Sequence, residues 1–142
     1  MNSAHPTRDL VFIIIDEERS RFEEKLEQLI RDLASSGKWS LQPPEVVEIE
    51  GEDRVGGLLR LYSELTPRGE ALSIDADAAN LDEVTRLVEA LTTFSSENHL
   101  EIEFELDGEC VGDINGGQLS KSLAVGLLGE WRRVLNERIK AQ

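Results

Sequence analysis

The stretch LEIEFELDGECVGDINGGQ, residues 100–118, contains six acidic residues and no basic one. Apolar residues alternate with glutamates from residue 100 to residue 106, and this two-residue period predicts a strand with one buried and one solvated face. Asp107-Gly108 follows, and this dipeptide is typical of the two-residue type I′ turn, in which both central residues have positive φ. The stretch is therefore predicted to form a β-hairpin with one acidic side.

The returning strand of this hairpin needs an irregularity. A regular register would place Asp113 opposite Ile102, which puts a carboxylate on the apolar face. One extra residue at Gly112 shifts the phase, so that Ile114 joins Val111 on the buried side. Glycine tolerates the backbone conformation of a bulge. We therefore expect a β-bulge near Gly112.

A calcium-binding loop is the first alternative for the acidic residues. In a frame that starts at Asp107, the sixth position is Gly112, as an EF-hand loop requires. The fifth position, Val111, has no side-chain oxygen, and the twelfth, Gln118, is not the required glutamate. A frame that starts at Asp113 fails at the same two positions, so we expect no metal here.

The glutamates are also poor candidates for catalysis, because they lie in a row along one strand, spaced by about 6.6 to 7 Å. General acid–base catalysis needs two carboxylates in a cleft, with environments that separate their pKa values. Two interpretations remain. The charges deter sheet-to-sheet aggregation if the strand lies at an edge, or they form a docking surface for a basic partner. The candidate partner-binding residues are Glu101, Glu103, Glu105, Glu109 and Asp113.

The overall charge favours a basic partner. The chain has 142 residues, suited to one domain, with 29 acidic and 15 basic residues and a net charge of −14. Such a field repels nucleic acid and anionic membranes, attracts basic proteins and speeds their encounter. Solubility or adaptation to a salty cytoplasm is the alternative explanation. Residues 87–120 carry eight acids and no Lys or Arg, whereas residues 121–142 carry five bases and two acids.

We expect a cytoplasmic protein without disulfides. No apolar run approaches the length of about 20 residues that spans a bilayer. The first ten residues have neither an apolar signal core nor an Arg/Ser-rich amphipathic pattern. The single cysteine, Cys110, excludes an internal disulfide.

Hydrophobic periodicity predicts an α+β fold. The run LVFIII at 10–15 is typical of a strand covered on both faces, and apolar spacing after Asp16 predicts a long helix that ends at Gly37. The other predicted elements are a strand at 45–50, a short helix at 57–65 for which a strand is the alternative, a strand at 70–77, a helix capped by Asn80 and Glu83, the hairpin, and a C-terminal helix from 118 to 140.

These elements give the order β-α-β-(α)-β-α-β-β-α. We expect a mixed, mostly antiparallel sheet of about five strands, with three long helices in a single layer on one face. Residues 1–8 are predicted to be a flexible tail, and residues 9–142 a single domain.

Other candidate sites are weaker. Asp16 and Glu17 follow a strand, and with Asp75 they would form a divalent-ion cluster if the two strands were neighbours. The chain lacks nucleophile-elbow, phosphate-loop and zinc motifs, so we expect no enzyme and no cofactor. Cys110 lies among acids, which disfavour its thiolate, and His99 follows a helix end.

The last predicted helix contains Gly126 and Gly129, each of which costs about 1 kcal/mol relative to alanine. Either this helix packs very close to the sheet or to another chain, or it breaks near Gly126. A homodimer joined through this helix is one form of packing against another chain.

The sequence thus favours a small acidic binding protein that recognises a basic protein surface. Its most concrete form is an immunity protein or antitoxin that occludes the active site of a cationic toxin such as a nuclease. The alternatives are an acidic chaperone for a secreted effector, or a metal-dependent enzyme or ligand-binding domain that uses the cluster of Asp16, Glu17 and Asp75.

Overall fold

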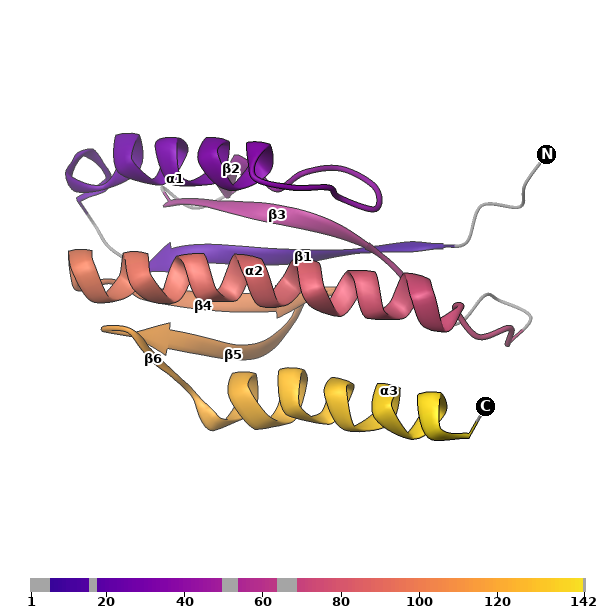
Figure 1. Cartoon of the computed structure of the whole chain (residues 1–142). Coiled ribbons are helices and arrows are strands. Elements are labelled where there is room, and N and C mark those ends of the chain that lie inside the picture. Colours follow the sequence, from indigo (N-terminus) through magenta and orange to yellow (C-terminus); the bar gives the residue numbers. More distant parts are fainter. Residues whose placement is uncertain (1–5, 16–17, 50–53, 64–68, 142) are drawn as a thin grey trace.

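One antiparallel sheet carries three helices on a single face (Figure 1). The computed structural model describes residues 6–15, 18–49, 54–63 and 69–141. Its elements are β1 (Thr7–Ile15), the 3₁₀ turn η1 (Arg19–Arg21), α1 (Glu23–Ser35), β2 (Glu45–Ile49), β3 (Arg54–Tyr62), α2 (Ile74–Asn98), β4 (Glu101–Leu106), β5 (Glu109–Asn115), β6 (Gln118–Leu119), the π-helix η2 (Ser122–Gly129) and α3 (Glu130–Lys140). The strand order is β2-β3-β1-β4-β5-β6.

This architecture confirms the predicted α+β fold, with helices on one face. Every strand pair is antiparallel. The sheet has six strands because β3 and the short β6 are added to the five predicted, whereas the predicted strand at 70–77 is not part of it. β1 begins at Thr7, within the segment predicted to be a tail. Among the described residues, no helix is both long enough and apolar enough to cross a membrane.

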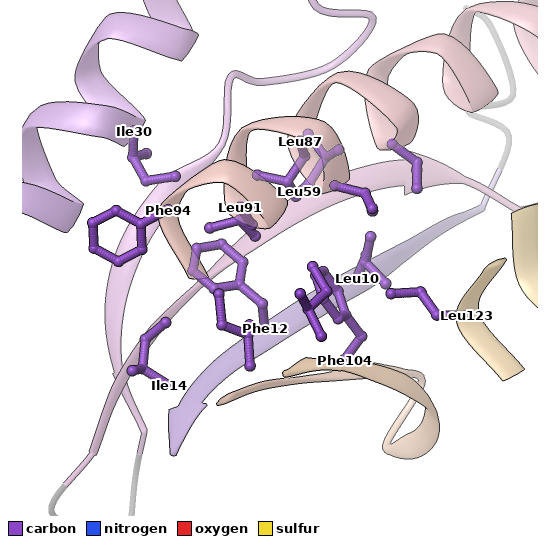
Figure 2. Close-up of a cluster of buried hydrophobic side chains, with 14 of the residues drawn as sticks. Leu10, Phe12, Ile14, Ile30, Leu59, Leu87, Leu91, Phe94, Phe104 and Leu123 are labelled. Atoms are coloured by element: carbon purple, nitrogen blue, oxygen red, sulfur yellow. The ribbon is translucent and has the colours of Figure 1, made fainter. Parts of the chain in front are cut away.

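The core lies between the sheet and α2, and alternate residues of β1 anchor it. Leu10, Phe12 and Ile14 are at most 1% exposed and point toward the helices (Figure 2). The ring of Phe12 packs against Phe104 of β4, with ring centroids 6.4 Å apart. Leu87 of α2 is fully buried in the same cluster. Every second residue of β1 from Leu10 to Ile14 therefore faces the helices, as the alternation of side chains along a strand requires.

The hairpin of β4 and β5 has the predicted turn and bulge. Asp107 and Gly108 have φ of 54° and 83°, as a type I′ turn requires. The register shifts between Phe104 and Glu105, where Val111 is the extra residue, and Gly112 has φ of 140°. Ile114 is fully buried and Val111 packs against the same core, so the bulge brings both onto the helix side, as expected.

The predicted helix at 57–65 was wrong. Residues 54–62 form β3, whose Leu59 and Leu61 are buried in the core while Leu58 and Arg60 point to the other side. Gly57 allows β3 to lie beside β1, because a Cβ atom there would stand 2.4 Å from the ring of Phe12. Pairing on both sides, with β1 and β2, outweighs the helical spacing of the leucines. Leu65 lies outside the described residues.

The predicted strand at 70–77 was also wrong, and the second long helix begins earlier than expected. Ser73 caps α2, and its hydroxyl accepts a backbone N–H of the first turn at 3.2 Å. Asn80 and Glu83, predicted as a capping pair, are buried inside α2. The Asn80 amide donates to the Tyr62 carbonyl (3.3 Å), and the Glu83 carboxylate accepts from Ser40 N (3.1 Å). These contacts tie α2 to distant segments.

The other two helices follow the predicted periodicity with changes at their ends. α1 buries Leu26 and Ile30 against the core, whereas Asp16, its predicted cap, lies outside the described residues. The C-terminal segment is π-helical before α3, and Leu119 belongs to β6. Gly126 is exposed, and a Cβ atom there would meet nothing within 4 Å, so close packing within the chain does not explain it.

Candidate functional site

The face of the sheet opposite the helices is the main candidate site, and we call it the open face. Residues paired directly across antiparallel strands share a face, so the register assigns it. It comprises alternate residues of β1 to β5: Asp9, Val11, Ile13, Ile15, Glu45, Val47, Ile49, Arg54, Leu58, Arg60, Glu101, Glu103, Glu105, Cys110 and Asp113. None of the apolar residues in this set packs against the hydrophobic core.

An aliphatic strip runs across the open face. The aliphatic strip consists of six residues: Val11, Ile13, Ile15, Val47, Ile49 and Leu58. Ile13, at the centre, is only 6% exposed, and the other five are half-buried. The sequence predicted that β1 is covered on both faces, but the described helices cover only one. The apolar character of the second face therefore has no explanation within the described part of the chain.

The predicted carboxylates lie beside this strip. We call Glu101, Glu103, Glu105 and Asp113 the acidic row; all four are half-buried. Within the described part of the chain, their side chains form no salt bridge or hydrogen bond. The bulge places Asp113 directly opposite Glu103. Like charges in directly opposite positions destabilise a sheet, so this arrangement works against the stability of the isolated fold.

The position of β4 excludes one interpretation of the row. β4 lies between β1 and β5 rather than at an edge of the sheet. Charges on an edge strand deter sheet-to-sheet aggregation because the edge has unpaired backbone groups, but the backbone of β4 is paired on both sides. The carboxylates of β4 therefore do not protect an edge of the sheet.

The open face carries few cations to balance the row. Arg60 pairs with Asp9 across β1 and β3, with Nε and Oδ1 3.1 Å apart. Arg54 is at the far end of β3, whereas the row lies on β4 and β5, on the other side of β1. The result is an apolar strip with an acidic flank, which resembles the apolar centre and polar rim of protein interfaces.

Two neighbouring residues of β5, Glu109 and Cys110, lie on opposite faces of the sheet. Glu109, predicted to be part of the binding surface, pairs with Leu106, whose side chain packs against the core. Glu109 therefore lies on the helix side of the hairpin, exposed and away from the row. Cys110 pairs with Glu105, so it is on the open face, and it is exposed. This thiol lies at the margin of the acidic row.

The structure gives little support to a metal centre. Asp16 and Glu17 lie outside the described residues. Ile15, which precedes them, is at the opposite end of the sheet from the beginning of α2, which carries Asp75 (Figure 1). Within the described ranges, no three His, Cys, Asp or Glu side chains are grouped to hold a metal ion. His99 has φ of 54° at the C-terminal cap of α2, which is a turn position, as predicted.

A cavity of about 410 Å³ between α2, α3 and the segment before α2 is the second candidate site. Its apolar wall includes Leu127 and Trp131. Its buried carboxylate, Asp77, accepts hydrogen bonds from Trp131 Nε1 (2.8 Å) and Arg138 Nη1 (2.9 Å), so both oxygens already have partners. At the rim, a hydrogen bond from Arg133 lowers the pKa of Glu130. The polar groups join helices to one another and present no unpaired group to a ligand.

Sequence reasoning found the acidic row but not the aliphatic strip beside it. The available signal was the continuous apolar run at 10–15, whose alternate residues face opposite sides of the sheet. The half of the strip contributed by β2 and β3 could not be assigned without the strand register. Comparisons with models of protein families, with curated proteins and with solved structures found no match for this chain.

Proposed function

We propose that this protein is a non-enzymatic binding domain that recognises a basic surface of another protein through its open face. One observation carries the proposal: a strip of aliphatic side chains lies on the face that no described helix covers, beside carboxylates that have no partner within the described chain. A partner that covers the strip removes apolar surface from water, at about 25 cal/mol per Å². Its Lys or Arg side chains would neutralise the row.

The net charge of −14 also favours a basic partner. A field of this sign speeds the encounter with a cationic protein and slows the encounter with nucleic acid. Charge matching supplies a fast association rate and specificity, whereas affinity comes chiefly from the buried apolar contacts. The two parts of the open face thus have separate roles.

The most concrete form of the proposal is an immunity protein or antitoxin that neutralises a cationic toxin. A nuclease active site is built to hold phosphates, and the acidic row would occupy those positions and exclude the substrate. Occlusion needs no chemical step, in agreement with the cavity of about 410 Å³, in which both oxygens of the buried Asp77 are already bonded to side chains of α3.

The test uses the single cysteine of the chain as a site-specific handle. A photoactivatable cross-linker on Cys110 would capture a partner from cells of the source organism, and the purified partner would then be studied by stopped flow. We expect a basic protein whose association rate falls steeply as salt increases. Changing Glu101, Glu103 and Glu105 together to Lys should slow association at least tenfold, because attraction becomes repulsion.

Glu89→Lys is the matched control, because Glu89 is exposed on α2, on the other side of the sheet from the acidic row, and the substitution changes the charge in the same way. Glu89→Lys should alter the association rate far less than a single change from Glu to Lys in the acidic row. An association rate indifferent to ionic strength and to reversal of the row would contradict the proposal. So would a partner that cross-links equally well to a cysteine moved onto α2.

A further inference from the structure

We infer that the part of the partner that covers the open face is an amphipathic α-helix with a basic flank, lying along β1. The inference rests on the proposed function and names the form of the partner. It follows from three features of the open face: its paired backbone, the aliphatic residues that follow one another along β1, and the spacing of the acidic row.

The backbone of the sheet offers nothing to an incoming segment on this face. Its N–H and C=O groups are used within the sheet, since β3, β1 and β4 are each paired on both sides. An extended segment laid on the face would bury its own backbone groups without partners, and buried unpaired groups of this kind are rare and costly. A helix satisfies its backbone internally and can bury one side against the aliphatic strip.

The strip has the shape of a helix contact. Val11, Ile13 and Ile15 follow one another along β1, and Leu58 lies beside Val11 on β3. From Val11 to Ile15 the strip extends for about 13 Å along β1, the length of a helix segment of about nine residues. On the covered face of the same sheet, α2 runs along the strands in this way (Figure 1). The open face presents a shorter apolar contact that no described helix covers.

The spacing of the carboxylates matches one flank of such a helix. Glu101, Glu103 and Glu105 repeat along β4 at about 6.6 to 7 Å. Residues four apart on a helix are separated by about 6 Å along its axis. Lys or Arg at positions i, i+4 and i+8 therefore falls opposite the three glutamates, and the long flexible side chains absorb the small difference. Asp113, opposite Glu103, would contact the central cation.

The occupant is basic on the flank toward β4 and apolar beneath. On the β3 side, Arg60 is already paired with Asp9, so these two charges need no partner from the occupant. A second copy of this chain fits less well, because two acidic rows and two molecules of charge −14 would be brought together. The charge distribution thus selects a cationic helix rather than self-association.

The probe is a synthetic amphipathic peptide of about 20 residues, with a leucine stripe and lysines along one flank at four-residue spacing. Two matched peptides have the same composition apart from the tested feature: one carries the lysines on the side opposite the leucines, and the other has two central residues replaced by proline. Binding is followed by an environment-sensitive fluorophore on Cys110 and by peptide anisotropy, with the full chain.

We expect the flanked helix to bind at least tenfold more tightly than either matched peptide. Changing Glu101, Glu103 and Glu105 to Lys should abolish this preference and create one for a peptide with glutamates along the flank. Glu89→Lys should leave all affinities within about twofold. The reciprocal switch is informative because a variant that merely failed to fold would bind neither peptide.

Two outcomes overturn the helix while the proposed function stands: equal binding of the proline peptide, or equal binding of the lysine-relocated peptide, in each case with continued dependence on the acidic row. Binding that ignores the row, or that leaves the Cys110 fluorophore unchanged, overturns both proposals. Sedimentation of the unliganded chain as a dimer that the peptide does not dissociate overturns both as well, because a second copy then covers the face.

Discussion

Removing one charge from the acidic row should stabilise the isolated protein. Glu103 has Asp113 directly opposite on β5 and Glu101 and Glu105 two residues away on β4. Glu103→Gln keeps the size and shape of the side chain but removes three repulsions. Because the row has no cationic partner within the described chain, the substitution removes no attraction in exchange. We therefore predict a higher free energy of unfolding.

The magnitude follows from the strand geometry. Two unit charges about 5 Å apart, as across the strands, repel by about 0.8 kcal/mol in water, and two about 7 Å apart by about 0.6 kcal/mol. With a Debye length of about 8 Å at physiological salt, one cross-strand and two along-strand repulsions total about 1 kcal/mol. At about 1 M salt the Debye length is near 3 Å, and the total falls to about 0.3 kcal/mol.

The assay is urea unfolding followed by circular dichroism, because urea leaves the ionic strength unchanged. Glu103→Gln should raise the free energy of unfolding by about 1 kcal/mol at physiological salt, and the gain should shrink at high salt. Glu89→Gln, on the exposed side of α2, should stay within about 0.5 kcal/mol of the parent. A loss of stability, or a gain independent of salt, would refute the idea of a self-repelling row.

Three further substitutions test the fold. Asp77→Ala removes the acceptor of Trp131 and Arg138 and should cost about 2 to 3 kcal/mol in urea unfolding, since a buried charge loses its partner; the exposed Asp75→Ala should cost less than about 1 kcal/mol. Leu59→Ala should cost about 2 to 5 kcal/mol by the same assay, well above a change to alanine at residue 58, because only Leu59 is in the core. Gly108→Ala should lower the melting temperature, since alanine disfavours a φ of 83°.

The comparison of Asp77→Ala with Asp75→Ala separates the contacts of Asp77 from the effect of a charge in the first turn of α2. Asp77 and Asp75 are both acidic residues in the first turn of α2, so both interact favourably with the helix dipole. Only Asp77 is buried, and only Asp77 bonds to α3. Equal losses at the two positions would show that the contacts with α3 contribute little.

The hairpin could be predicted from sequence because its signals are local. The alternation of β4, the turn at Asp107-Gly108 and the phase shift before Ile114 all lie within nineteen residues, and each depends on the conformational preferences of those residues. The stripe of α1 was predictable for the same reason. A helix is specified by contacts between residues three and four apart.

The two wrong elements had signals that depended on distant partners. The leucines of β3 fit helical spacing as well as alternation, and pairing with β1 and β2 decided between them. The segment before α2 looked like a strand, but only Ala71 forms an isolated bridge, and Ser73 caps a helix instead. Asn80 and Glu83 resembled a cap by spacing alone, whereas their actual contacts are with Tyr62 and Ser40.

By itself, the sequence determined the composition of the hairpin, the acidic character of one of its sides and the apolar run of β1, because these depend on residue type and short spacing. Only the tertiary structure decided that β4 lies inside the sheet, that Asp113 faces Glu103, and that no described helix covers the second side of β1 beside the acidic row. Strand order and register arise from contacts between residues far apart in the chain, and short-range periodicity does not contain that information.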